Sequence, residues 1–480
     1  MNTVVESKSA LESLSRSALI AAAIKAGVAP TKAYSTKSVV LRELILASQT
    51  PGPVAVASVE VVAEEPEEEA NQPAPAIEEI ADANVVPFEA EAVQTEIKPE
   101  AVTVKPEDSR GIFKVGRKAF QKQLVALSKV VGHSNMQVLN CVLLEFAAGK
   151  LRVSGTNLDN YVTTEVPAET AGDVKIAINY AILKAFVSKC ASEFMMAEVK
   201  GMTLHLSDIV NKTRIMGIKH EEFVPTPDSA TAVSILEIQA KQLVKVLGEM
   251  LPCASIDETR YILNGVCLDM AKKAANPVVV ATDGRRLSRT LLLADKTHAH
   301  GRFIIPSKTV EALMQGLPEG ATVELLSSSN ASRMLARSSS GGFTYGAAFK
   351  LVDGNFPNWN QVVPKGDRPS FTIDREEFLA ALARVSVLVT EKSNSVKLTF
   401  GPEVLRLNTA AVDYGDGAEP VSVKTNHGKE IRVAINPEFL RSILAAWSDD
   451  TVIFQVNDEL SPLTITAGDK LAVVMPVRLS

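Results

Sequence analysis

The feature that most constrains the fold is a short strand followed by an amphipathic helix, which occurs three times along the chain. In the first copy the apolar residues Phe120, Leu124 and Leu127 fall at positions i, i+4 and i+7, so they form one stripe along a helix. Copies with the same spacing begin at Leu236 and Phe371. This threefold recurrence predicts three copies of one domain.

A second strand–helix unit lies between these copies and also occurs three times, starting at Val174, Gly301 and Glu430. The long period is therefore about 120–135 residues and the half-period about 60, so each predicted domain has two strand–helix halves. Polar residues suited to cap the second helices precede them, and a proline at a first helical turn is well tolerated. These residues are Asn179, Ser307 and Asn436, the last followed by Pro437.

The remaining parts of each copy alternate between apolar and polar residues, as in 142–155, 265–284 and 396–409. Alternation with period two predicts antiparallel hairpins, and amphipathic helices would cover one face of them. The predicted fold class is therefore α+β. The predicted domains span residues 111–231, 232–367 and 368–480.

The first 110 residues have a different composition. Between Ser58 and Arg110 fifteen Asp and Glu residues face three Lys and Arg, a net charge of −12. Because the whole chain carries −6, the remainder carries +6, which is compatible with a nucleic-acid-binding surface. Proline and glutamate throughout residues 50–110 predict a disordered, extended linker.

Residues 1–49 predict a small helical module of their own. An alanine-rich helix ends near Gly27, and a leucine-rich helix follows from Lys37. This arrangement loosely resembles the SAP-type module, which binds DNA. A helical hairpin that serves only for docking remains the alternative.

Cysteine and histidine spacing predicts neither a metal site nor a disulfide framework. The four cysteines, Cys141, Cys190, Cys253 and Cys267, lack CxxC spacing, and the six histidines lack an HExxH motif. We expect four buried thiols in a reducing compartment and no cofactor. No apolar run approaches the ~20 residues of a bilayer span, and no signal peptide is evident, so the sequence predicts a soluble cytoplasmic protein without a membrane partner.

Specific motifs accompany the triplicated pattern. They are Arg260–Gly265 (RYILNG), Ala281–Leu287 (ATDGRRL), Leu351–Pro357 (LVDGNFP) and Val473–Leu479 (VVMPVRL). Their order and register over about 370 residues resemble the bacterial sliding clamp, the beta subunit of DNA polymerase III. The resemblance implies a homodimer closed head to tail into a ring of six domains around duplex DNA. Such a ring has no catalytic residues and confers processivity.

The resemblance also implies which residues contact DNA. A sliding ring attracts phosphate without reading the sequence, so it needs dispersed cations on the repeated helices. Lysines occur on the polar side of most amphipathic helices, so the resemblance alone directs these towards DNA. The helix candidates are Lys118, Lys122, Lys129, Lys184, Lys189, Lys241, Lys245, Lys308 and Arg384. The resemblance adds His133, Arg260 and Tyr261, which lie in loops that family members use to contact DNA.

A pocket for partner peptides is implied between the last two domains, where family members bind motifs containing Gln, Leu and Phe. Such a pocket needs apolar walls and a few polar groups. The walls would be Leu263, Thr282, Gly284, Arg285, Arg286, Leu287, Pro357, Val362, Val473, Met475, Pro476, Val477 and Arg478, flanked by Asn436 and Phe439. Expected partners are double-stranded DNA, the clamp loader, the replicative polymerase and other proteins carrying this peptide.

The predicted dimer interface is formed by Val387 and Leu388 in the last domain, against Ile215 and Ile218 in the first. Two other functions stay open at this point. An enzyme could use Asp283 as an acid or base with the neighbouring arginines on an anionic substrate. A clamp paralogue could instead act as a scaffold for a plasmid or phage replicon.

Overall fold

The computed structural model describes residues 110–132, 134–208, 211–227, 231–270, 276–328, 331–390, 394–411, 415–425 and 427–478. All of them belong to one compact unit, Pro99–Ser480. The predicted helical module at 1–49, the predicted linker up to residue 109 and the candidate DNA contact His133 lie outside the described residues.

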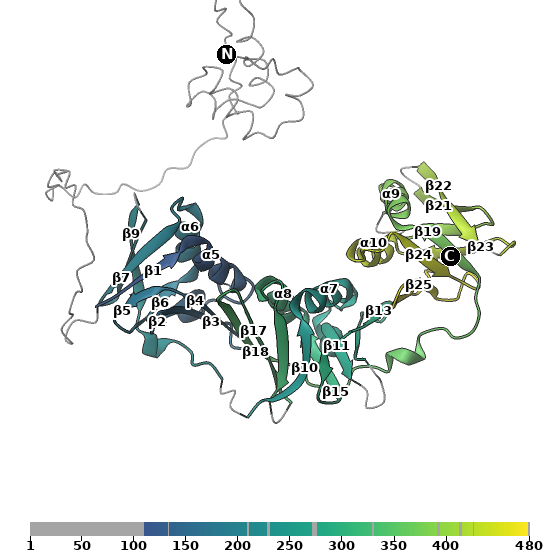
Figure 1. Ribbon diagram of the computed structural model, residues 1–480. Coiled ribbons are helices and arrows are strands. Elements are labelled where there is room, and N and C mark those ends of the chain that lie inside the picture. Colours follow the sequence, from purple (N-terminus) through teal and green to yellow (C-terminus); the bar gives the residue numbers. More distant parts are fainter. Residues whose placement is uncertain are drawn as a thin grey trace, which may run out of the picture. The chain divides into compact units, whose positions relative to one another are not determined.

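The first repeat consists of nine strands and two long helices in the described part of the chain (Figure 1). Their bounds are β1 (Arg110–Gly116), α5 (Arg117–Ala126), β2 (Cys141–Ala147), β3 (Lys150–Thr156), β4 (Asn160–Pro167), β5 (Glu169–Ala171), β6 (Val174–Asn179), α6 (Tyr180–Lys189), β7 (Phe194–Lys200), β8 (Thr203–Ser207) and β9 (Lys212–Ile218).

The central repeat follows the same order, and the last repeat has one strand fewer between its two long helices. The central repeat comprises β10 (Val233–Gln239), α7 (Ala240–Met250), β11 (Gly265–Met270), β12 (Val278–Thr282), β13 (Arg286–Leu291), β14 (Lys296–Thr297), β15 (Gly301–Pro306), α8 (Ser307–Gly316), β16 (Thr322–Ser327), β17 (Arg333–Ser340) and β18 (Phe343–Lys350). The last repeat comprises β19 (Ser370–Asp374), α9 (Arg375–Ser386), β20 (Val396–Phe400), β21 (Val404–Ala411), β22 (Gly415–Thr425), β23 (Ile431–Ile435), α10 (Pro437–Ala446), β24 (Thr451–Gln455), β25 (Leu463–Ala467) and β26 (Lys470–Val474).

The predicted α+β class and the two strand–helix halves of each repeat are confirmed: each long helix directly follows a strand. The helical stripe Phe120, Leu124 and Leu127 is fully buried, and its counterparts in the other repeats are buried as well. The helices therefore pack their apolar side against the sheets, where the main core lies. The domain boundaries themselves stay predictions.

Two of the three predicted helix caps are confirmed. The Asn179 side chain accepts a hydrogen bond from the Ile182 amide, and Asn436 accepts one from Glu438, with Pro437 at the first helical position. The prediction for Ser307 is wrong. It is the first residue of α8, and its hydroxyl donates to the Asn264 carbonyl at 3.0 Å, so it ties the helix start to a neighbouring loop.

The sheets continue from one repeat into the next, which the sequence pattern did not predict. Strand β4 of the first repeat pairs antiparallel with β18 of the central repeat, from Asn160↔Phe349 to Glu165↔Thr344. Strand β13 of the central repeat pairs with β26 of the last, from Arg286↔Val474 to Arg289↔Leu471. The repeats are therefore joined by shared backbone hydrogen bonds as well as by side-chain packing.

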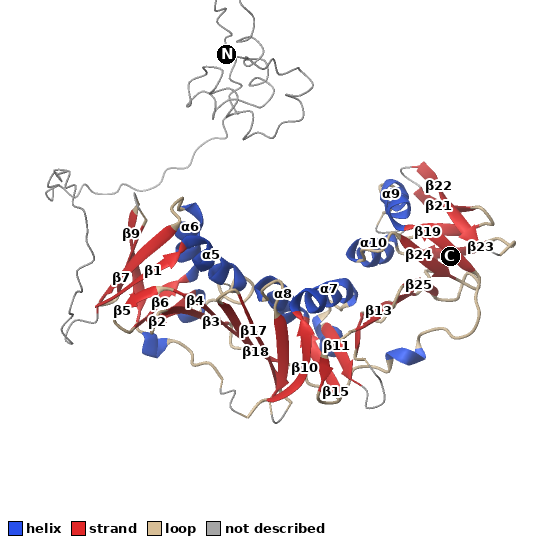
Figure 2. Cartoon of the chain, viewed as in Figure 1, coloured by secondary structure: helices blue, strands red, loops and turns tan. Residues whose placement is uncertain are grey.

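The six long helices form one row in which each contacts the next, in the order α6, α5, α8, α7, α10 and α9. Within each repeat the two helices lie on one side of the strands (Figure 2). This order keeps the two helices of each repeat together and joins consecutive repeats, because α5 contacts α8 and α7 contacts α10 across the two junctions. The polar sides of the six helices consequently form one surface.

The cysteines are free and buried, as expected. Burial raises the pKa of Cys253 and of Cys267 to about 12, so these thiols stay protonated at neutral pH. Within the described part of the chain, helices long and apolar enough to cross a membrane are absent.

Candidate nucleic-acid and partner-binding sites

An apolar surface lies over the seam between β13 and β26. Leu287 pairs with Val473 across this seam, and both side chains are buried in a small cluster with Phe356. Because side chains alternate along a strand, Arg285 and Met475 continue the same face beyond the end of the pairing, where the Met475 amide donates to the Arg285 carbonyl at 2.9 Å. The structure therefore brings together the pocket residues predicted from three separate motifs.

The walls of this surface differ in exposure. Leu263 packs against the cluster, whereas Val362, Met475 and Val477 are 38–53% exposed although apolar. The remaining exposed members are Gly284, Arg285, Pro357 and Arg478, and Thr282 and Pro476 are half-buried. Exposed valine and methionine beside a buried apolar floor can accept the apolar anchors of a peptide.

The loop from Thr282 to Arg286 is fixed by its own hydrogen bonds. The Asp283 carboxylate accepts from the amides of Arg285 and Arg286 at 2.8 and 2.9 Å. The Thr282 hydroxyl donates to the Arg286 carbonyl at 2.7 Å and accepts from the Gly284 amide at 3.1 Å. Gly284 has φ +85°, a backbone conformation in which glycine is favoured. The loop is thus held in a defined conformation beside the apolar surface.

Arg286 bridges the central and last repeats. Its Nε donates to Asp283 Oδ2 at 3.0 Å, and its guanidinium lies 4.7 Å from the centre of the Phe439 ring. A further guanidinium nitrogen donates to the Ser442 hydroxyl on α10. Because these contacts fix its guanidinium between the loop and α10, Arg286 supports the pocket wall from behind, whereas Arg285 is exposed.

The same loop leaves little capacity for acid–base catalysis. Both carboxylate oxygens of Asp283 are occupied, one by two backbone amides and the other by Arg286. In the described residues no group of three or more His, Cys, Asp or Glu side chains is arranged to hold a metal ion. The contacts of Asp283 therefore give it a structural role in the loop.

The candidate DNA contacts lie on the row of helices and on one loop. Lys118 and Lys122 are on α5 with Lys129 just after it, Lys184 and Lys189 are on α6, Lys241 and Lys245 on α7, Lys308 on α8 and Arg384 on α9. Most of these side chains are exposed, and Lys184 is half-buried over the Tyr180 ring. The helix order thus gathers cations from three repeats on one surface.

Three of the candidate cations on or next to the six helices have acidic partners. Lys129 pairs with Glu311 at 2.8 Å, Lys245 with Glu249 at 3.9 Å and Arg384 with Glu419 at 2.9 Å. The hydrogen bond from Arg384 lowers the pKa of Glu419, which keeps that carboxylate ionised. Sequence reasoning missed these pairs because the acidic partner of Lys129 or Arg384 is far away in the chain.

Arg260 and Tyr261 lie in the short helix Glu258–Leu263 next to the pocket loop. Tyr261 is 57% exposed, whereas Arg260 donates to the Asp283 carbonyl at 3.1 Å and lies 3.5 Å from Asp257. The candidate DNA loop is therefore connected directly to the candidate peptide pocket, which the sequence did not indicate.

The predicted dimer residues differ in their exposure to solvent. Val387 is 82% exposed, and Leu388 lies near Gly417 of β22. Ile215 is buried in the core of its own repeat, and Ile218 packs against a small cluster around Cys141. The isoleucine side chains are thus occupied within the chain itself.

Two half-paired strands lie at these positions, and an edge strand was expected near Ile215 and Ile218. β9 pairs with β8 from Lys212 to Met216 and with β6 only at Gly217 and Ile218. β22 pairs with β21 from Gly415 to Ser422 and with β19 only at Val423 to Thr425. Each strand therefore has a stretch with one unpaired edge in the described structure. Lys212 and Arg214 are exposed on β9, and Asp416 is exposed on β22.

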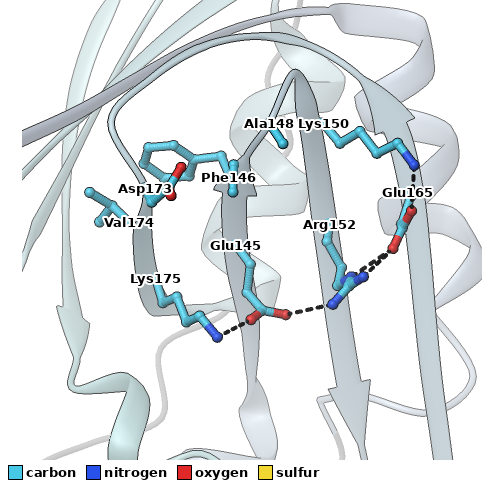
Figure 3. Close-up of a pocket in the computed structure, with 10 residues that line it drawn as sticks. Glu145, Phe146, Ala148, Lys150, Arg152, Glu165, Asp173, Val174 and Lys175 are labelled. Atoms are coloured by element: carbon cyan, nitrogen blue, oxygen red, sulfur yellow. Dashed lines mark hydrogen bonds and ion pairs between the residues drawn. The ribbon is translucent and has the colours of Figure 1, made fainter.

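A further cleft of about 350 Å³ lies on the strand face of the first repeat (Figure 3). Lys175 and Arg152 contact Glu145 at 2.7 and 3.9 Å, and Arg152 and Lys150 contact Glu165 at 2.7 and 3.5 Å. These residues lie opposite or near one another on adjacent strands, so their charges form a cross-strand ladder. The ladder leaves its five members paired with one another, and we assign no ligand to this cleft.

Three repeats of one α+β unit, joined by antiparallel seams and carrying one row of helices, define a DNA-clamp fold. Two family models match the chain: DNA polymerase III beta subunit, central domain, over residues 237–358, and the C-terminal domain of the same subunit over residues 360–478. The chain belongs to the family of bacterial DNA polymerase III beta subunits, the beta sliding clamps.

Similar proteins agree with this assignment. The beta sliding clamp of Rickettsia felis is 24% identical over 347 residues, which are 69% of this chain and 89% of that protein. The clamp of Synechococcus elongatus is 27% identical over 363 residues, 73% and 94% of the two chains. The crystal structure of the Thermotoga maritima beta subunit has a TM-score of 0.70 at 23% identity and covers 77% of this chain and all of that one.

Proposed function

We propose that the protein is a DNA sliding clamp, which encircles duplex DNA and tethers the replicative polymerase and other replication or repair proteins to it. The row of six helices carries this proposal, because it presents dispersed lysines from successive repeats on one surface. Such a surface attracts the regularly spaced phosphates of any duplex and makes no base-specific contact. The chain can therefore hold DNA while moving along it.

Processivity in this scheme requires no chemical step by the protein. A closed ring turns dissociation from DNA into movement along DNA, so the protein acts as a processivity factor and not as an enzyme. The occupied carboxylate of Asp283 supports this proposal against an acid–base role. Because the DNA it serves is in the bacterial cytoplasm, we place the protein there.

A ring requires two chains joined head to tail, so the first repeat of one protomer meets the last repeat of the other. The half-paired strands β9 and β22 support this arrangement, since their unpaired edges could complete one another's sheets. Opposite exposed charges, Lys212 and Arg214 against Asp416, would favour this pairing. Val387 is exposed beside the same edge.

Partner proteins would bind at the seam between β13 and β26. An extended peptide with Gln, Leu and Phe side chains would place its apolar anchors over Leu287, Val473 and Met475. The clamp loader and the polymerase would share this one site. Binding at the seam would therefore be competitive.

The test is retention of the full-length protein on nicked circular DNA after treatment with a clamp loader and ATP. We expect the protein to stay on circles and to be lost once the DNA is linearised with a restriction enzyme. Equal retention on linear DNA would indicate binding without encirclement. Loss from both forms would contradict the clamp function.

A further inference from the structure

The cations on the row of helices fall into two chemically different groups. Six lysines have no carboxylate within ion-pair distance in the described part of the chain: Lys118, Lys122, Lys184, Lys189, Lys241 and Lys308. The first four belong to α5 and α6 of the first repeat and the last two to α7 and α8. Within their bounds α5 and α6 contain neither Asp nor Glu, so their positive charge is uncompensated.

The cations of α9 and α10, in contrast, are engaged with groups of their own repeat. Arg384 pairs with Glu419 at 2.9 Å, and Arg441 donates to Glu438 at 2.8 Å. Arg375 donates to the Asp449 carbonyl at 2.7 Å and contacts Glu376 at 3.2 Å. Both helices also begin with acidic residues, Glu376 and Glu377 in α9 and Glu438 in α10. Their net charge is therefore zero.

The helix surface is also hollowed at the junction of the first two repeats. A cavity of about 520 Å³ is lined by Lys122 of α5 and Lys241 of α7, together with Val244, Met314, Leu317 and Glu319. The Lys122 ammonium lies 4.6 Å from the centre of the Phe343 ring, so it is positioned by a cation–π contact. Two lysines that face one hollow from different helices could bind a phosphate together.

We infer that the first repeat, together with α7 and α8, carries the phosphate contacts of this clamp, and that the last repeat contributes little; this rests on the proposed function. Paired cations offer little net charge to a phosphate, whereas unpaired lysines release counterions when they bind one. Duplex DNA would consequently lie against α5 and α6 of each protomer. The ion pairs along the row therefore exclude Arg384 as a phosphate contact, because Glu419 neutralises its charge.

The experiment compares two variants of the full-length protein that lose the same net charge. K118Q/K122Q removes unpaired lysines from α5, and R384Q/R441Q removes paired arginines from the last repeat. Binding to a short fluorescent duplex is measured by anisotropy at several salt concentrations, and the slope of log K against log salt is determined. K184Q/K189Q on α6 repeats the lysine test independently.

We expect each lysine variant to reduce the magnitude of the slope by about 1.8 for each bound protomer, because every lost phosphate contact contributes about 0.9. The arginine variant should change it by less than half as much. Adding E419Q and E438Q to the arginine variant should return the slope to its wild-type value, because the carboxylates left without arginine partners are then removed as well. Equal losses in lysine and arginine variants would overturn the inference.

Retention on circular DNA separates this inference from the proposed function. If the wild-type protein stays on circles while the lysine and arginine variants lose duplex affinity equally, the clamp function stands and the uneven phosphate surface is refuted. If only the lysine variants lose duplex affinity but the wild-type protein is not retained on circles, the phosphate surface stands and encirclement is refuted.

Discussion

The two junctions between repeats join the same kinds of strand and helix with different chemistry. At the first junction the seam β4–β18 is the longer one, and the buried polar contact there is neutral: the Thr309 hydroxyl donates to Asn160 Oδ1 at 2.7 Å. At the second junction the seam β13–β26 is shorter, and charges are buried beside it. Lys470 of β26 is 7% exposed and contacts Glu249 of α7, 4% exposed, at 3.1 Å.

This difference shows that one repeated architecture does not fix how its copies are joined. Lys470 also contacts Asp449 and lies 5.4 Å from the centre of the Trp447 ring, so one ammonium group links α7 to two parts of the last repeat. Buried charges need good partners because their hydration is lost. The second junction thus depends on a few specific contacts, whereas the first depends on a longer run of backbone hydrogen bonds.

The largest effect is expected from Lys470→Ala. This substitution leaves Glu249 and Asp449 without their shared cation, and breaking a buried pair typically costs about 3–5 kcal/mol. We expect the free energy of unfolding to fall by about 3 kcal/mol in urea denaturation. Lys470→Met is the matched control for the lost side-chain volume. If both variants retained wild-type stability, the ionic contact would have no role at this junction.

A smaller loss is expected at the first junction from Thr309→Val, which keeps the shape of the side chain and removes its hydroxyl. Asn160 then lacks its buried donor, which typically costs about 1–3 kcal/mol. We expect about 1–2 kcal/mol by the same denaturation, and Thr309→Ser, which keeps the donor, should lose less. A loss as large as that of Lys470→Ala would remove the contrast between the junctions.

Ser442→Ala should have a still smaller effect on stability. Arg286 keeps its contacts with Asp283 and Phe439. The loss of its single hydrogen bond to Ser442 should therefore lower the free energy of unfolding by about 0.5–1.5 kcal/mol. Because Arg286 supports the pocket wall, we also expect weaker binding of a Gln/Leu/Phe peptide in fluorescence anisotropy. Unchanged peptide affinity would show that the pocket does not depend on this bridge.

The smallest effect at neutral pH is expected from Tyr345→Phe in β18 at the first junction. The Tyr345 hydroxyl is buried and lacks a hydrogen-bond partner among the described residues, so its removal should be neutral or slightly stabilising. Burial raises the pKa of Tyr345 well above its usual range. A folded-state pKa above the unfolded value means that stability is lost as pH rises beyond about 10. Thermal unfolding from pH 8 to 11 should therefore show a shallower alkaline loss in Tyr345→Phe than in wild type.

The fold could largely be predicted from the sequence because the pattern of strand and helix is local. Phe120, Leu124 and Leu127 show the buried helix face without any knowledge of the rest of the chain. The seams could not be predicted, since nothing in β13 indicates that β26 is its partner. The pairing of Lys470 with Glu249 is hidden for the same reason: the two residues meet only after distant segments have folded together.

The candidate site was predictable in part. The motifs around Leu287 and Val473 predicted one surface, but they did not show which of its charged side chains are engaged in contacts within the protein. Arg285 and Arg286 are neighbours in sequence, and only one of them is bound to Asp283 and Ser442 by its side chain. Likewise Arg384 resembles any other cation on a helix until Glu419 is seen beside it.

The seam between β13 and β26 has a consequence for synthesis of the chain on the ribosome. Strand β13 belongs to the central repeat, but its partner β26 is made only after nearly all of the last repeat. Until then β13 exposes an unpaired edge, to which strands of other nascent chains can add. The central repeat therefore completes its sheet late, and chains that stop before β26 should be prone to aggregate.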